Sequence, residues 1–284
     1  MTPLTDVELT SLIRLLSDDD ATILAMVTAK LLESGDRIVP VLQEARTRAS
    51  EPVRARIDGI LARLSGDVDP MFVLHEWHEL ADGEADIDLE RGVAALARFG
   101  DPKVDWELYH QRLDRMADEV AIRLAGVSEP FDIVQTLSEY LFQEQDFQGE
   151  PMDKPDGSYM NRVLDRRRGI PITLSAVCLL IAQRLDLPIY GVGLPAHFIV
   201  KYQTAATEIL FDPFSGGTIL TRDACADFLT RIGYRFTETF LDPVPNRYVL
   251  ARMLNNLIML YSNLGEHRKI ETLLEYRRLV TGEE

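Results

Sequence analysis

The stretch LPIYGVGLPAHFIVKYQTAATEILFDPFSGG, residues 187–217, decides the fold of this chain. It contains three runs rich in β-branched and aromatic residues, which predict strands over residues 189–192, 197–202 and 208–211. Residues 202–207 separate the second and third runs and predict a turn, so these two strands are expected to run antiparallel.

This turn predicts a register in which His197 faces Asp212 and Lys201 faces Glu208. The alternate positions are all apolar and are expected to face the core: Phe198, Val200, Ile209 and Phe211. Because successive side chains of a strand point to opposite faces of the sheet, His197 and Asp212 are expected on its open face, within hydrogen-bond reach of each other. Two interpretations need the same hydrogen bond: a remnant active site, or a histidine that only holds two strands together.

A buried helix is predicted immediately before these strands, over residues 171–185. Pro171 suits the first position of a helix, and the stretch from Leu174 to Ala182 is apolar nearly all round. A buried helix followed by an antiparallel sheet predicts an α+β fold.

The remaining segments read as helices. Residues 1–66 predict short paired helices of the HEAT-like repeat type, and residues 67–157 predict a helical region leading into the core. We expect the α+β core to occupy residues 158–245. Residues 246–284 predict a helical hairpin of about 34 residues, the length of one tetratricopeptide unit.

Composition limits the possible functions. Thirty basic and 46 acidic residues give a net charge of −16, so we expect no nucleic-acid partner and no membrane partner. The two cysteines, Cys178 and Cys225, predict no disulfide framework and favour a cytoplasmic location. Acidic but no basic residues precede Arg14, so no signal peptide is expected. No cofactor motif is evident.

Three ordered blocks carry a resemblance to a known family: SYMNRVLDRRRGIPITLS, LPIYGVGLPAHFIVKY and ILFDPFSGG, all within residues 158–217. They resemble the SirB-type bacterial proteins, which are transglutaminase-like domains followed by tetratricopeptide helices. The match is weak before Ser158. The resemblance implies a transglutaminase-like, papain-like core of a buried helix on an antiparallel sheet.

In that superfamily a cysteine opens the buried helix, and a histidine and an aspartate lie on the two strands that follow. The thiolate is the nucleophile, the histidine accepts its proton, and the aspartate holds the imidazole tautomer. The resemblance places His197 and Asp212 in the last two positions, and the cysteine position falls on Pro171. Because proline has no nucleophile, we expect no transglutaminase or thiol-protease activity.

Other nucleophiles are weaker candidates. Cys178 lies two helical turns beyond Pro171, about 10 Å further along the axis, in an apolar stretch where a thiol stays protonated. Cys225 lies on a later amphipathic segment. Thr173 and Ser175 are nearer, but a hydroxyl inside a helix can bond its own backbone instead.

A second group of candidate residues lies just before the buried helix. Arg162 and Arg168 belong to a basic cluster that suits an anion clamp, or only the cation-favouring end of a helix paired with Asp165. Tyr159 and Asn161 are candidates to line a binding groove, with local packing as the alternative. The string HEWHEL, residues 75–80, lacks the HExxH spacing, so no metal site is predicted.

These observations favour a transglutaminase-like protein without the catalytic cysteine, which binds a protein or peptide partner through the His197–Asp212 groove and its helical repeats. Two alternatives remain. One is a hydrolase or acyl-transfer enzyme that uses His197 with a substituted nucleophile or an activated water. The other is a structural scaffold that acts through its helical repeats.

Overall fold

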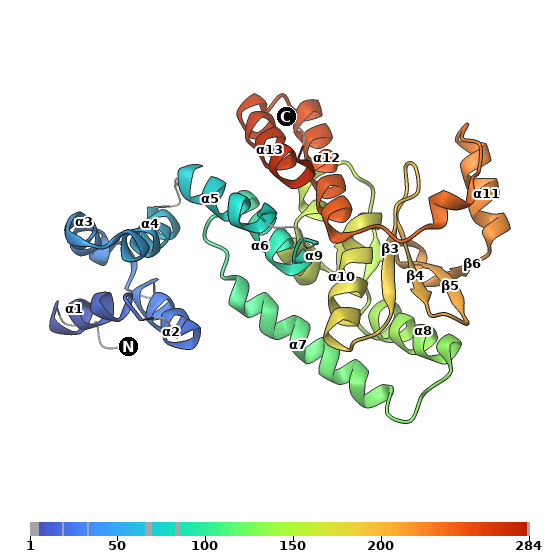
Figure 1. The fold of residues 1–284 in the computed structure, drawn as a ribbon, viewed down its shortest axis with the longest axis horizontal. Coiled ribbons are helices and arrows are strands. Elements are labelled where there is room, and N and C mark those ends of the chain that lie inside the picture. Colours follow the sequence, from blue (N-terminus) through green and yellow to red (C-terminus); the bar gives the residue numbers. More distant parts are fainter. Residues whose placement is uncertain (1–5, 19, 33, 66–69, 83–85, 283–284) are drawn as a thin grey trace. The chain divides into compact units, whose positions relative to one another are not determined.

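In the computed structural model of the chain, residues 6–18, 20–32, 34–65, 70–82 and 86–282 are described (Figure 1). The chain divides into two compact units: a smaller one of residues 1–76 and 98–104, and a larger one of residues 77–97 and 105–284. The predicted division into four segments stays a prediction, and its first boundary, between residues 66 and 67, lies outside the described residues.

The smaller unit is built from short helices. They are α1 (Asp6–Leu15), α2 (Ala21–Leu32), the 3-10 turn η1 (Gly35–Ile38), α3 (Val39–Arg48) and α4 (Glu51–Ser65). Each is too short to be stable alone in water, so they share one apolar cluster. Its buried members are Leu9, Leu16, Val27, Leu31, Ile38, Leu42, Ile57 and Ile60. The HEAT-like nature of these helices stays a prediction.

The larger unit contains a four-stranded antiparallel sheet in the order β3-β4-β5-β6. Its strands are β3 (Ile189–Val192), β4 (Ile199–Gln203), β5 (Glu208–Asp212) and β6 (Thr218–Leu220). A separate parallel pair joins β1 (Gln148–Gly149) to β2 (Arg168–Gly169). The predicted antiparallel pairing of the two strands that carry the site is confirmed.

The predicted register of β4 and β5 is wrong by two residues, because the turn is tighter than expected. Thr204 N–H donates to the Thr207 carbonyl at 2.9 Å, and the Thr204 hydroxyl oxygen accepts from the backbone N–H groups of Ala206 and Thr207. These bonds favour a two-residue loop over a longer one. Val200 therefore pairs with Phe211. A shift of two residues leaves every side chain on its predicted face.

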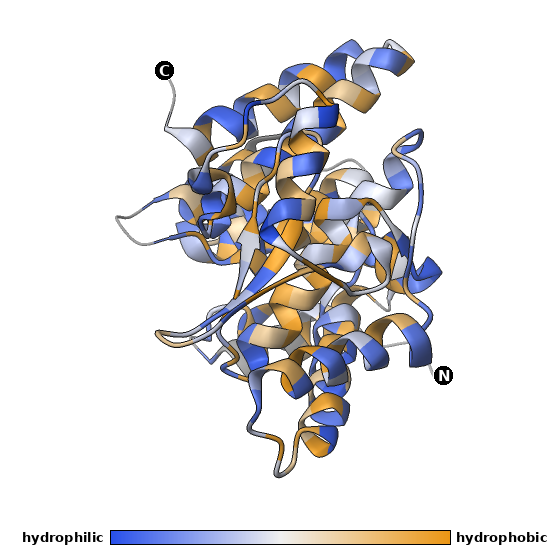
Figure 2. Ribbon diagram, turned by 90° about the vertical axis from the view of Figure 1, so that its right-hand side faces the viewer, coloured by the Kyte–Doolittle hydropathy of each residue, from blue (hydrophilic) through white to orange (hydrophobic). Residues whose placement is uncertain are grey.

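Helix α10 (Pro171–Arg184) packs against β3 and β4 and is buried from Ile172 to Ala182, as predicted. Figure 2 colours the ribbon by hydropathy, and strongly hydrophobic residues are frequent near the middle of its view.

The other face of the sheet is not open, and the prediction that it is open is wrong. Ile199 and Leu210 on that face are buried in a cluster with Cys225 and Leu229 of α11 (Arg222–Arg231) and with Leu241. Figure 1 shows α11 on the side of the sheet away from α10. The sequence pattern of the two strands alone does not reveal this cover, because it comes from residues that follow the sheet.

The other helices of the larger unit surround this core. They are α7 (Trp106–Arg123), α8 (Pro130–Ser138), its π-helical continuation η2 (Glu139–Glu144), η3 (Pro155–Ser158), α9 (Met160–Arg166), η4 (Pro213–Ser215), η5 (Glu238–Leu241), α12 (Asn246–Leu264) and α13 (His267–Thr281). The division between the two units falls within α5 (Pro70–Ala81) and α6 (Leu89–Gly100).

The C-terminal helices form the predicted hairpin and dock on the core. The Trp77 ring of α5 stacks on Tyr276 of α13 with centroids 4.7 Å apart. The Asp86 carboxylate accepts hydrogen bonds from the backbone N–H groups of Asn246 and Arg247, at 2.6 and 2.9 Å. Asp86 thus supplies the N-terminal cap of α12 from a distant part of the sequence.

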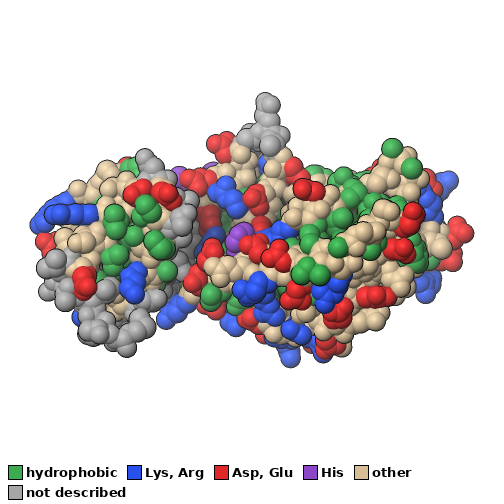
Figure 3. Space-filling model, turned by 90° about the horizontal axis from the view of Figure 1, so that it is seen from below, with side chains coloured by type: hydrophobic (Ala, Val, Ile, Leu, Met, Phe, Trp, Pro, Cys, Tyr) green, Lys and Arg blue, Asp and Glu red, His purple; other side chains and the backbone are tan. Residues whose placement is uncertain are grey.

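The surface carries charges of both signs. In the view of Figure 3, acidic and basic side chains are interspersed over the larger unit. Among the described residues, no helix combines the length and the apolar character needed to cross a bilayer.

Candidate functional site

His197 and Asp212 meet across β4 and β5 as predicted. His197 Nε2 lies 2.9 Å from Asp212 Oδ2, and the two side chains are 17% and 8% exposed. His197 lies two residues before β4, and continuing the register of β4 and β5 makes it a diagonal neighbour of Asp212, a separation that long side chains bridge. The expected hydrogen bond is therefore confirmed, and part of the imidazole remains open to solvent.

Asp212 is held by more than the histidine. Its Oδ1 accepts from the backbone N–H of Phe214 at 2.9 Å, and its Oδ2 accepts from the Ser215 hydroxyl at 2.8 Å. Burial alone would raise the pKa of Asp212, but the hydrogen bonds and charge of His197, with the bonds from Ser215 and Phe214, hold that pKa below its usual range. The carboxylate is therefore ionised at neutral pH.

An ionised Asp212 determines which imidazole nitrogen is available. Since the carboxylate only accepts, His197 donates through Nε2–H, and the neutral ring has its lone pair on Nδ1. Nδ1 has no hydrogen-bond partner among the described residues. Phe214 and Phe228 lie beside the ring, with centroids 5.9 and 5.6 Å from it. One nitrogen of a held imidazole thus remains available in aromatic surroundings.

The turn before His197 is strained. His197 N–H donates to the Leu194 carbonyl at 3.2 Å and closes a turn with Pro195 at its second position. The third residue, Ala196, has φ of +58°, a region that favours glycine. Strain of this kind at a non-glycine residue often accompanies a functional site.

Helix α12 supports this turn through two residues that the sequence analysis missed. Arg252 donates to the His197 carbonyl at 3.2 Å and to the Tyr248 hydroxyl at 3.4 Å. Gly193 lies so close to Tyr248 that a Cβ atom there would be 2.5 Å from the ring. No local motif marks either residue, because their role depends on how α12 packs.

The start of α10, where the family resemblance places a catalytic cysteine, has no cysteine. Pro171 is the first residue of α10. The Thr173 hydroxyl donates to the Gly157 carbonyl at 2.7 Å, and the Ser175 hydroxyl lies 3.4 Å from the Phe198 carbonyl. Both hydroxyls are buried and engaged with backbone. Neither is placed to attack a substrate.

The cysteines are equally unsuited to catalysis. Cys178 and Cys225 are both buried, and burial raises the pKa of each thiol. A protonated thiol without solvent access is not a nucleophile. The chain has no other cysteine.

The second group of predicted site residues does not gather around His197 through any observed contact. Tyr159 and Asn161 are buried, and the Tyr159 hydroxyl lies 2.7 Å from that of Tyr261. Their burial fits the packing alternative rather than a groove wall. Arg162 is exposed, and Arg168 donates to the Asp146 carbonyl at 2.9 Å. Their role in binding stays a prediction.

Two arginines of the basic cluster, Arg166 and Arg168, contact carboxylates other than Asp165. Arg166 forms two hydrogen bonds to Glu150, at 2.9 and 2.6 Å. Asp165 instead contacts Arg112 and Tyr109. Surface pairing therefore accounts for Arg166 and Arg168 without a ligand.

Comparison with known proteins shows the family. The model of the transglutaminase-like superfamily matches residues 107–255, just over half of the chain. The chain belongs to the transglutaminase-like superfamily. The matched region contains α10, the whole sheet and the first half of α12, so it includes every residue of the site described above.

Relatives of this transglutaminase-like chain support the SirB-type resemblance. A UPF0162 protein of Xylella fastidiosa is 29% identical over 202 residues, which cover 68% of this chain and 72% of the relative. Protein SirB1 of Salmonella typhimurium is 31% identical over 123 residues, 42% of this chain and 44% of the relative. F-box only protein 21 of Homo sapiens is 31% identical over 151 residues, 50% of this chain but 24% of the relative. No solved structure matches the chain.

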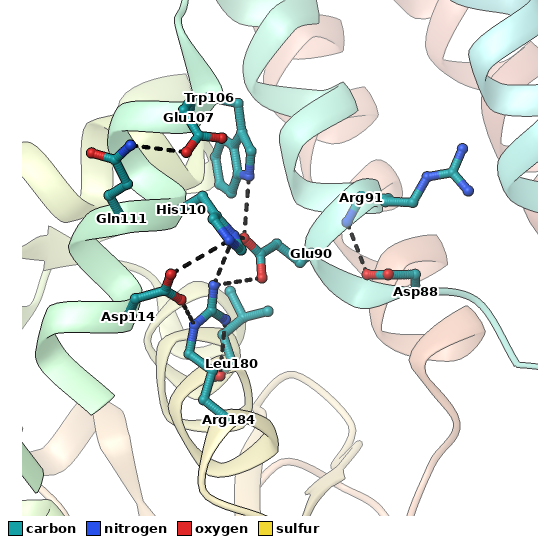
Figure 4. Close-up of polar contacts among 10 residues, drawn as sticks. All are labelled: Asp88, Glu90, Arg91, Trp106, Glu107, His110, Gln111, Asp114, Leu180 and Arg184. Atoms are coloured by element: carbon teal, nitrogen blue, oxygen red, sulfur yellow. Dashed lines mark hydrogen bonds and ion pairs between the residues drawn. The ribbon is translucent and has the colours of Figure 1, made fainter. Parts of the chain in front are cut away.

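The transglutaminase-like chain has a second polar cluster, which the sequence did not predict (Figure 4). Glu90 of α6, His110 and Asp114 of α7 and Arg184 of α10 meet there. Arg184 contacts Glu90 at 2.8 Å and Asp114 at 2.7 Å. His110 Nδ1 lies 2.6 Å from Glu90, and its Nε2 lies 3.4 Å from Asp114.

This cluster favours the charged imidazole. The hydrogen bond to Glu90 raises the pKa of His110, since burial opposes it less strongly. Protonated Nδ1 donates to Glu90, so its 3.1 Å contact with Arg184 is not a hydrogen bond in that state. Among the described residues, no group of three or more His, Cys, Asp or Glu side chains is arranged to hold a metal ion.

Proposed function

We propose that this transglutaminase-like protein does not use thiol catalysis and instead binds a protein or peptide at the surface around His197 and Asp212. The observation that carries the proposal is Pro171 at the first position of α10, together with the burial of both cysteines. Loss of the nucleophile from such a triad removes most of the rate.

The contacts and the backbone strain that hold His197 and Asp212 in place support the binding half of the proposal. Asp212 keeps three hydrogen bonds, and the turn that presents His197 tolerates a left-handed alanine. Ala196 and Ser215 are exposed beside a partly exposed imidazole, so a ligand has access to the site. Binding needs shape and hydrogen bonds rather than a nucleophile. We place the protein in the cytoplasm, with its helical segments as additional contact surface.

The catalytic half is tested with a panel of amide and ester substrates and a thiol-directed probe on the folded protein. We expect no turnover and no labelling of Cys178 or Cys225. Labelling that abolishes turnover would show that the nucleophile had been assigned to the wrong position.

The binding half is tested by selecting peptides from a displayed library on the purified protein. We expect selected peptides to bind the wild type, to lose at least tenfold in affinity in His197→Ala, and to be unaffected in His267→Ala. His267 is an exposed histidine at the start of α13 and serves as the matched control. Peptides that bind both variants equally would indicate that the helical segments form the binding surface. That result would favour the alternative of a structural scaffold.

A water-activating hydrolase is the second candidate, favoured by one observation. His197 Nδ1 has no hydrogen-bond partner among the described residues, while Asp212 holds Nε2, which is the tautomer that a general base requires. Turnover that disappears in His197→Ala and is insensitive to alkylation of both cysteines would establish this function in place of the first.

A further inference from the structure

Arg252 is a cation beside the candidate site with no acidic partner. Its two hydrogen-bond contacts are the His197 carbonyl and the Tyr248 hydroxyl, and no carboxylate pairs with it among the described residues. A guanidinium has five N–H donors, so donors remain for a further acceptor. In a chain with 46 acidic and 30 basic residues, an arginine at a candidate site without a carboxylate partner calls for an explanation.

The helix positions Arg252 and Tyr248 as a pair. They lie four residues apart on α12, so their side chains leave the same face of the helix. Buried neighbours on that helix, Val249 and Met253, anchor it to the core. Both side chains contact the segment from Gly193 to His197, which ends in the strained turn.

We propose that Arg252 anchors the C-terminal carboxylate of a peptide whose last side chain is apolar, next to His197. This inference rests on the proposed function, because it names the chemical class of the ligand that the His197 surface binds.

Guanidinium geometry and the neighbouring rings both support this ligand. The planar fork of arginine matches a carboxylate, and such charge-assisted bonds are among the strongest in proteins. Phe214 and Phe228 beside the imidazole, and the exposed ring of Tyr248, offer apolar contact to the side chain of the peptide's last residue. The net charge of −16 disfavours a multiply charged anion such as a polyphosphate at the same position.

The test compares two probes that differ only in this group: N-acetyl-Ala-Ala-Phe with a free carboxylate and the same peptide as its C-terminal amide. Binding to the full chain is measured by calorimetry and by NMR shifts of the arginine side-chain N–H signals. We expect the free acid to bind the wild type at least about tenfold more tightly than the amide, since the amide loses a charge-assisted pair.

Variants then locate the carboxylate. Arg252→Gln is expected to remove the preference for the acid, and Arg252→Lys to restore part of it through charge alone. Arg268→Gln, an exposed arginine on α13, should keep the full preference. Tryptophan fluorescence checks that each variant is folded, and the comparison of acid with amide in the wild type needs no variant.

Each outcome decides the proposal. Equal affinity for acid and amide, retention of the preference in Arg252→Gln, tighter binding of inorganic phosphate than of the acid, or no binding of either peptide overturns it. If both peptides bind equally and His197→Ala abolishes both, the proposed peptide-binding function stands and only the role of Arg252 fails.

Discussion

Two histidines of the larger unit contact carboxylates, and they are held in different ways. His197 bonds Asp212 through one nitrogen, and both residues belong to one hairpin. His110 lies between Glu90 and Asp114, so both of its nitrogens contact acidic groups, and Arg184 completes the cluster from a third helix. His197 Nδ1 therefore has no hydrogen-bond partner among the described residues, whereas both His110 nitrogens lie near carboxylates.

This difference distinguishes the candidate site at His197 from the cluster around His110, which links three helices. Nearly half of the His110 side chain is exposed, at 45%, against 17% for His197. Exposure alone would therefore favour His110 as the functional histidine. The contacts of the two rings argue against this, because both His110 nitrogens face carboxylates, at 2.6 and 3.4 Å, whereas His197 Nδ1 has no hydrogen-bond partner among the described residues. The cluster instead ties α6, α7 and α10 together (Figure 4).

The largest effect on stability should come from removing Arg184 from this cluster. Arg184, whose side chain is 14% exposed, neutralises Glu90 and Asp114. Arg184→Leu leaves Glu90 and Asp114 with only the more exposed imidazole of His110 as a nearby cation and is expected to lower the free energy of unfolding by about 2–3 kcal/mol. Urea titration followed by tryptophan fluorescence measures this, because both tryptophans, Trp77 and Trp106, lie in the larger unit.

Arg166→Leu is the matched control, since Arg166 likewise makes two contacts with carboxylate oxygens, both of them on Glu150, but is more exposed. It should cost less than about 1 kcal/mol. Equal losses in the two variants would show that the three-helix cluster is no more important than a surface pair.

A smaller effect is expected at the hairpin. Asp212→Asn weakens the bonds from His197, Phe214 and Ser215 and should cost about 1–2 kcal/mol at neutral pH. Because the pKa of Asp212 is lowered on folding, its contribution is present above about pH 4, the unfolded value, and is lost as the pH falls through the folded value. Urea titrations at pH 7, 5 and 3.5 should therefore show the wild type and variant converging in acid.

Asp227→Asn, an exposed aspartate on α11, should show neither the loss nor the convergence. A difference between wild type and Asp212→Asn that stays constant from pH 7 to 3.5 would contradict the ionised state assigned to Asp212.

The smallest effect concerns His110 and has the opposite pH dependence. Its pKa is raised on folding, so its contribution is full below the unfolded value of about 6.5 and is lost as the pH rises through the folded value. Since the side chain is 45% exposed, we expect His110→Gln to cost only about 0.3–0.5 kcal/mol, after allowing for solvent screening.

The measurement is the difference in unfolding free energy between wild type and His110→Gln at pH 5.5 and pH 8.5, with His267→Gln as control. A difference that grows with pH would mean that the neutral imidazole, rather than the cation, is the form that Glu90 and Asp114 stabilise.

The hairpin could be predicted from the sequence because its contacts are local and periodic. Alternation with a period of two assigned His197 and Asp212 to one face, and an error of two residues in the register did not change that face. The buried helix was recognised because Leu174 to Ala182 is apolar on every side. That this helix begins without a cysteine followed from Pro171 at its first position.

Other features could not be predicted, because they depend on contacts between segments far apart in the chain. The cover over Ile199 and Leu210 comes from α11, and the support of the His197 turn comes from Arg252 on α12. Asp86 caps a helix that begins 160 residues later. Such contacts leave no periodic signal, since each depends on the angle at which two helices or a helix and a sheet pack.

The sequence by itself determined the α+β class, the contact between His197 and Asp212, and the absence of a cysteine at the start of α10. These follow from side-chain chemistry and from the periods of strand and helix. Only the tertiary structure decided which imidazole nitrogen is left without a partner, that His110 joins a cluster linking three helices, and that Arg252 lies beside the site with no acidic partner among the described residues. The physical reason is that hydrogen bonds and ion pairs depend on distances of a few tenths of an ångström, which packing sets and local sequence does not.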